Sequence, residues 1–99
     1  MTFKILICDK IADEGIKLLA EKGYEVTKAW NKPKTELPKI AAEYDALIVR
    51  SATKVKEELL ANAKKLRVIG RAGEGLDNID LKKAKQLGIA VVKTPHVSY

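Results

Sequence analysis

Short apolar runs alternate along the chain with amphipathic stretches, and this alternation predicts the secondary structure. Runs rich in aliphatic residues are typical of strands. The first run is continuous enough to be covered on both faces, the third is predicted to be buried, and the polar half of the second suggests an edge position. The predicted strands span residues 3–9, 24–30, 45–50, 66–70 and 89–93. Between them, apolar residues recur at helical spacing. The predicted helices span residues 12–23, 35–42, 55–65 and 80–88.

The ends of the predicted helices carry capping signals. Gly23 and Gly88 stand where a helix commonly ends on a glycine. Asp13 falls in a first turn, where the helix dipole favours an acid. Thr35 is predicted to cap the second helix, with Pro38 tolerated in its first turn.

The alternating order of strands and helices predicts the fold. It requires parallel pairing with right-handed crossovers, which gives an α/β domain with helices on both faces of a five-stranded sheet. Five strands in this pattern favour the flavodoxin-like order 2-1-3-4-5. Residues 1–99 form one domain without repeats or linkers. No helix follows the fifth strand to cover its flank, so we expect a truncated piece of a longer lobe.

Charge and composition narrow the choice of ligand. The 99 residues carry 19 Lys and Arg against 13 Asp and Glu, a net charge of +6 that suits a small anion and would permit nucleic acid. The lysines are dispersed, which favours a solvated coat over a nucleic-acid surface. They include Lys32, Lys34, Lys39, Lys64, Lys65, Lys82, Lys83 and Lys85. We therefore expect a small anionic partner and no nucleic acid.

Other classes of chemistry find little support in the sequence. The only cysteine, Cys8, lies in an apolar run, so we expect a buried thiol in a reduced environment. No segment has the roughly 18 apolar residues of a membrane helix, which predicts a cytoplasmic protein without membrane contact. The only histidine, His96, lies in the last five residues without an acidic neighbour. We expect no metal site and no catalytic residue in this chain.

The first candidate binding loop follows the third strand. In open α/β sheets, ligands bind at the carboxyl ends of the strands, and loops 9–12, 50–55 and 70–80 lie there. Arg50, Ser51 and Thr53 present a guanidinium, hydroxyls and backbone N–H groups that can bind a carboxylate or phosphate. Alternatively, Ser51 or Thr53 caps the next helix while Arg50 pairs with a surface acid.

The second candidate loop follows the fourth strand and is rich in glycine. Its spacing over residues 70–75 is GxxGxG rather than the GxGxxG of dinucleotide sites, and Lys93 ends the next strand where such sites carry an acid. A cofactor site is therefore disfavoured. We expect an anion pocket formed by Arg71 and the backbone amides of Ala72 and Gly73.

Three polar residues close this second loop. Asp77, Asn78 and Asp80 are predicted to cap and support the turn rather than touch a ligand, because such side chains often bond to nearby backbone. Since the two loops follow successive strands, we expect both to face one crevice.

These segments resemble a known family. "YDALIVRSATKV", "LRVIGRAGEGLDNIDL" and "GIAVV" are similar to the amino-terminal part of the D-isomer-specific 2-hydroxyacid dehydrogenases, from about Lys4 to Pro95. The resemblance implies a substrate-binding lobe of flavodoxin-like fold. It also implies a separate Rossmann lobe that carries NAD and the catalytic arginine, acid and histidine, and a later segment that completes the first lobe.

The resemblance also implies roles for the candidate residues. In the family, the loop of Arg50, Ser51 and Thr53 contacts the phosphate or carboxylate side of the substrate, and the loop of residues 71–73 holds its carboxylate through amides. Asp77 and Asn78 occupy the supporting turn. With the other lobe absent, we expect a monomer that binds substrate without turnover. The chain departs from the family at Lys93, where the family usually has Asn before the hinge.

Two other functions are compatible with the predicted fold. A response-regulator receiver has the same topology, but it needs an aspartate at the carboxyl end of the third strand, and Asp45 lies at the opposite end. An inert domain with no activity is the other alternative, because a fold does not imply a function.

Overall fold

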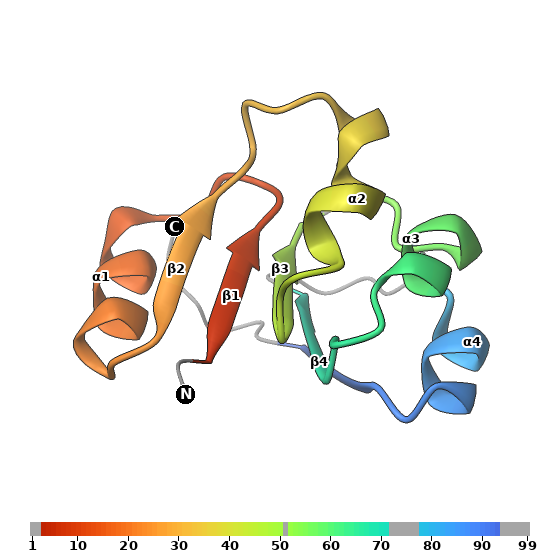
Figure 1. Cartoon of the computed structure of the whole chain (residues 1–99). Helices are drawn as coiled ribbons and strands as arrows, with labels where there is room; N and C mark the ends of the chain where they lie inside the picture. Colours follow the sequence, from red (N-terminus) through yellow and green to blue (C-terminus); the bar gives the residue numbers. More distant parts are fainter. Residues whose placement is uncertain (1–2, 51, 72–77, 94–99) are drawn as a thin grey trace.

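The structure, a computed structural model, describes residues 3–50, 52–71 and 78–93. Strands and helices alternate as the sequence predicts (Figure 1). They are β1 (Lys4–Ile7), α1 (Asp13–Glu21), β2 (Glu25–Lys28), the 3₁₀ helix η1 (Lys34–Glu36), α2 (Leu37–Ala41), β3 (Ala46–Val49), α3 (Glu57–Asn62), β4 (Val68–Arg71), α4 (Leu81–Gln86) and β5 (Ala90–Lys93).

The five strands form one parallel sheet in the order β2-β1-β3-β4-β5, which confirms the predicted topology. In the register of the central strands, Leu6 pairs with Leu47, and Leu47 pairs with Ile69. Because all strands run in one direction, their carboxyl ends meet at a single edge of the sheet. The ends of β3 and β4 lie side by side there, with Val49 paired to Arg71.

At two of the boundaries that differ from the prediction, tertiary hydrogen bonds compete with local propensity. Arg71, predicted to lie in a loop, is the last residue of β4. Val55, predicted to lie in the third helix, forms an isolated parallel bridge with Ile79. Its N–H donates to the carbonyl of Asn78 at 2.8 Å, and its carbonyl accepts from Asp80 N at 2.8 Å. The helix therefore begins two residues later, at Glu57.

The prediction that Thr35 caps the second helix is wrong. Thr35 lies inside η1, and the N-cap of α2 is Glu36, which makes no side-chain capping bond. The chain enters the helix through a 3₁₀ turn that follows Pro33, so no residue in extended conformation stands where a side-chain cap would act. Pro38 does lie in the first turn of α2, as expected.

Three of the predicted helix ends are confirmed. Gly23 and Gly88 follow α1 and α4 with φ of 90° and 75°, a region that residues with a Cβ rarely adopt. Asp80 is the N-cap of α4, where its carboxylate accepts a hydrogen bond from Lys83 N at 3.0 Å.

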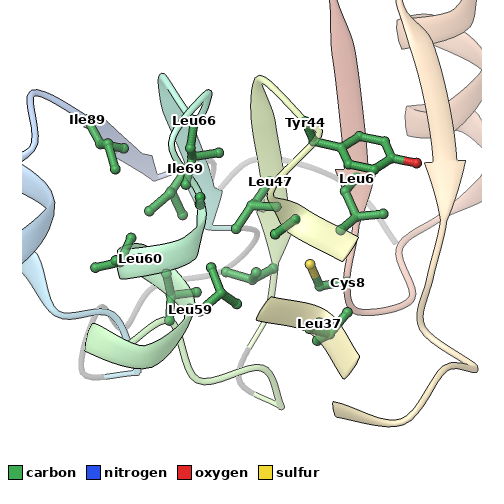
Figure 2. Packing of buried hydrophobic residues seen from close by; sticks show 14 of the residues in the cluster. Leu6, Cys8, Leu37, Tyr44, Leu47, Leu59, Leu60, Leu66, Ile69 and Ile89 are labelled. Carbon is green, nitrogen blue, oxygen red and sulfur yellow. The ribbon is translucent and has the colours of Figure 1, made fainter. Parts of the chain in front are cut away.

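Alternate residues of the strands pack on opposite faces of the sheet. Leu47 points toward α2, α3 and α4, into the larger cluster of buried side chains (Figure 2). Val49 belongs to the same cluster. Ala46 and Ile48 point to the other face, where they pack with residues of β1 and α1. Helices thus lie on both faces, α1 on one and α2 to α4 on the other (Figure 1).

The face on the α1 side is only partly covered. Of the helices in residues 3–50, 52–71 and 78–93, only α1 contributes to its hydrophobic cluster. An apolar groove of about 460 Å³ lies beside α1, and its lining includes Leu18 and Val92, which are 54% and 46% exposed. The fold therefore leaves apolar area in contact with solvent on this face.

Candidate functional site

The predicted loops begin next to each other at the carboxyl edge of the sheet. Arg50 directly follows Val49, the register partner of Arg71. The main chains of the two arginines are therefore close. Four other predicted residues, Ser51, Ala72, Gly73 and Asp77, lie outside the described residues, and their roles remain predictions.

Asp9, at the end of β1, holds the loop after β3 through its carboxylate. Oδ2 accepts the backbone N–H groups of Arg50 and Thr53 at 2.7 and 3.0 Å. Oδ1 accepts the hydroxyl of Thr53 at 2.7 Å. Hydrogen bonds to an ionised acceptor are stronger than neutral ones, so this carboxylate fixes the course of the loop.

Lys34 supplies the counter-charge to Asp9 from a distant part of the chain. Its Nζ donates to Asp9 Oδ1 at 2.8 Å, to the carbonyl of Cys8 at 3.0 Å and to Thr53 Oγ1 at 2.9 Å. Three acceptors match the three N–H bonds of an ammonium group. The side chain of Asp9 is 6% exposed and that of Lys34 is 44% exposed, so the pair joins a buried anion to a partly solvated cation.

Asn78 holds the same loop from the other side. Its Nδ2 donates to the carbonyls of Arg50 and Thr53, each at 2.7 Å. The loop is therefore fixed by its N–H groups on Asp9 and by its carbonyls on Asn78. Asn78 is predicted to support its own turn after β4, and the side-chain bonds that the structure shows are to the turn after β3.

The side chain of Thr53 stabilises the loop and does not cap a helix. It is 1% exposed, and α3 begins at Glu57 with Lys56 as its N-cap. The alternative in which Thr53 caps this helix is therefore wrong, because the hydroxyl bonds to Asp9 instead.

The side chain of Arg50 borders a hollow between the ends of β1, β2 and β3. The hollow measures about 470 Å³, and its lining is Asp9, Lys10, Trp30, Lys34, Arg50 and Ala52. Arg50 Nη1 donates to the carbonyl of Lys10 at 3.4 Å, which directs the guanidinium toward this side. Three cations and one anion give the hollow a positive balance that favours an anionic ligand. Arg71, unlike the exposed Arg50, is buried, with only 9% of its surface exposed.

Two ionisable groups near this hollow have shifted pKa values. Burial raises the pKa of Asp9, but the hydrogen bonds from Lys34, from the Thr53 side chain and from the loop amides outweigh burial and hold it below its ordinary value. Burial, with a smaller contribution from the charge of Asp9 and against an opposing one from Lys34, raises the pKa of the Cys8 thiol to about 12. Asp9 is thus ionised and Cys8 is an unreactive thiol at neutral pH.

Lys34 is a residue of this edge that the sequence does not predict. In the sequence it is one of the dispersed lysines, yet its Nζ bonds to Asp9, 25 residues away. No local pattern marks such a pair. Asp9 carried a partial signal, because it follows a predicted buried strand at the edge where ligands bind.

The described ranges contain neither a cluster of potential metal ligands nor a membrane-spanning helix. No three His, Cys, Asp or Glu residues of those ranges gather as potential ligands of a metal ion. No helix of the same ranges has the length and apolar character needed to cross a membrane.

Comparison of the sequence with known proteins identifies the family of this chain. The model of the D-isomer specific 2-hydroxyacid dehydrogenase family, catalytic domain, matches residues 5–99. The chain belongs to this family. It is 46% identical to the D-3-phosphoglycerate dehydrogenase of Methanocaldococcus jannaschii, over 96% of this chain and 18% of that protein. It is 43% identical to the hydroxypyruvate reductase of Thermotoga maritima, over 97% of this chain and 31% of that protein.

A solved structure of the family has the same fold. The 3-phosphoglycerate dehydrogenase of Entamoeba histolytica with bound NAD+ superimposes with a TM-score of 0.80 at 31% identity, over 95% of this chain and 33% of that one. The chain thus spans about a fifth to a third of the length of these relatives. Its membership, together with Asp45 at the start of β3, leaves no support for the receiver alternative.

Proposed function

We propose that this chain is the substrate-binding lobe of an NAD-dependent D-3-phosphoglycerate or related 2-hydroxyacid dehydrogenase, an enzyme class of serine biosynthesis. It binds the anionic hydroxyacid at the carboxyl edge of the sheet, through Arg50 and Ser51 of one loop, which the buried Thr53 stabilises, and through Arg71, Ala72 and Gly73 of the other. By itself it carries out no hydride transfer.

The observation that carries the proposal is the position of Arg50. Its loop is fixed by Asp9 and Asn78, and its side chain borders a hollow with a positive balance of charge. A guanidinium carried by a fixed main chain is a suitable partner for carboxylate or phosphate groups, because its N–H groups form a planar fork. The loop thus offers a prearranged site for a small acid.

The described residues do not fit an NAD site. Dinucleotide sites carry a carboxylate at the end of the second strand of the binding unit, where it accepts hydrogen bonds from the ribose. After β4, the next strand ends on Lys93, a cation. We therefore assign NAD and the catalytic groups to another part of the enzyme, as the family resemblance implies.

Nuclear magnetic resonance titration of the chain with 3-phosphoglycerate tests the proposal. We expect shifts confined to the residues of the hollow and to Gly70 and Arg71. Arg50→Gln should weaken binding by about tenfold or more, since it removes a charge-assisted contact. Arg67→Gln is the matched control, because Arg67 is exposed at the opposite edge of the sheet, just before β4.

Two results would contradict the proposal. An absence of shifts at the carboxyl edge would favour the inert domain, and equal loss of affinity in both arginine variants would indicate only nonspecific charge attraction. Formation of NADH from NAD+ and 3-phosphoglycerate by the purified chain would overturn its assigned inactivity.

A further inference from the structure

We propose that Lys34 is a positioning residue for the anion site and that it acts through Asp9. This inference rests on the proposed function, because it assigns to the same site the residue that keeps it able to accept an anion. Lys34 comes from η1, outside both loops that the sequence singled out.

The loop after β3 needs Asp9 as a hydrogen-bond acceptor. The backbone N–H groups of Arg50 and Thr53 point inward, and their acceptor is one carboxylate oxygen of Asp9. Buried N–H groups require acceptors. The loop therefore depends on a carboxylate placed beneath it.

The same carboxylate places a negative charge beside the hollow. Asp9 is 5% exposed and lines the same hollow as Arg50. An anion in this hollow would be repelled by Asp9 at short range, where screening by water is weak. The carboxylate that arranges the loop therefore opposes the ligand that the loop is proposed to bind.

Lys34 resolves this conflict. Its ammonium lies 2.8 Å from Asp9 Oδ1 and also bonds to Thr53 Oγ1, so it cancels the negative charge and holds the hydroxyl that contacts the same carboxylate. We infer that Lys34 makes the hollow acceptable to an anion while Asp9 continues to hold the loop amides.

The test compares four variants of the chain in 3-phosphoglycerate titrations. Lys34→Met should weaken binding by about tenfold, because it leaves the charge of Asp9 uncompensated. Lys34→Arg should largely restore affinity. Lys32→Met is the matched control: it removes the same charge two residues away, from an exposed side chain with no hydrogen bond or ion pair within the described residues, and should leave affinity unchanged.

The double variant Asp9→Asn with Lys34→Met separates positioning from direct contact. If Lys34 acts through Asp9, removal of both charges should recover most of the affinity lost in Lys34→Met, since the Asn oxygen can still accept the loop N–H groups. If Lys34 bonds to the ligand itself, the double variant should bind as weakly as Lys34→Met. That second result would overturn the inference.

Amide hydrogen exchange in the ligand-free chain is an independent test of whether Lys34 holds the loop. Lys34→Met should speed exchange at Arg50 and Thr53 by about tenfold relative to the amides within β3, whereas a general loss of stability would speed all of them together. Wild type that shows no ligand shifts would refute the anion site, and exchange would then decide only whether Lys34 holds the loop. Unchanged exchange at these two amides would overturn the inference.

Discussion

At the scale of single residues, one carboxylate organises the carboxyl edge of the sheet. Asp9 accepts four hydrogen bonds: two from loop amides, one from a hydroxyl and one from an ammonium. These donors hold its pKa below the ordinary value although burial alone would raise it. The ionised form of Asp9 is therefore part of the folded structure.

The pH dependence of the stability of the Asp9→Asn variant should show how much the charge of Asp9 contributes. At pH 7 we expect the free energy of unfolding to fall by about 2 kcal/mol, because bonds to an ionised acceptor become neutral ones. A lowered pKa in the folded state stabilises the protein above the unfolded-state pKa of about 4, and this stabilisation is lost as pH falls through the folded-state pKa.

Urea unfolding at several pH values measures the effect. The difference in unfolding free energy between wild type and variant should be constant from about pH 7 to 5 and should shrink below about pH 4. A difference that does not change down to about pH 2 would contradict the role of the charge.

At the scale of secondary structure elements, the helices differ in how their first N–H groups are satisfied. α4 has a side-chain cap, the carboxylate of Asp80. α1 has none: its N-cap is Ala12, with φ −63° and ψ 144°, a backbone conformation that suits a capping side chain. The same physical rule therefore predicts opposite effects of substitution at the two positions.

Asp80→Ala should lower the free energy of unfolding by about 1 kcal/mol, because it removes the acceptor for Lys83 N. Ala12→Ser should raise it by about 0.5–1 kcal/mol, because a hydroxyl can accept an unpaired N–H of the first turn. The midpoint of urea unfolding should shift in opposite directions while its slope stays constant. Shifts of the same sign would argue against the capping explanation.

At the scale of the whole molecule, the two faces of the sheet are unequally covered. Three helices pack on the face to which Leu47 points, and α1 packs on the face to which Ile48 points. Leu47 is fully buried, whereas Ile48 is half-buried and borders the apolar groove. Two neighbouring residues of one central strand thus lie in different environments, one in a closed core and the other beside a groove open to solvent.

Truncation of these two residues should measure the asymmetry. Leu47→Ala should cost about 3 kcal/mol of unfolding free energy, since it leaves a cavity in a closed core. Ile48→Ala should cost about 1–2 kcal/mol, because its side chain is already partly in contact with solvent. Equal losses in thermal or urea unfolding would show that the α1 face is as tightly packed as the other.

The sequence by itself determined the order of elements, the parallel topology and the edge that holds the candidate site. These follow from apolar runs, helical periodicity and glycines such as Gly23 and Gly88, all of which act within a few residues. The family could also be recognised, because its loop motifs are continuous in sequence.

Only the tertiary structure decided how the loop after β3 is held. Asp9, Lys34 and Asn78 reach it across 19 to 44 residues, and neither charge nor spacing marks which lysine meets which acid. It also decided that Thr53 bonds inward and that Thr35 does not cap α2. Local patterns encode backbone conformation, whereas such pairings depend on which strand ends the fold brings together.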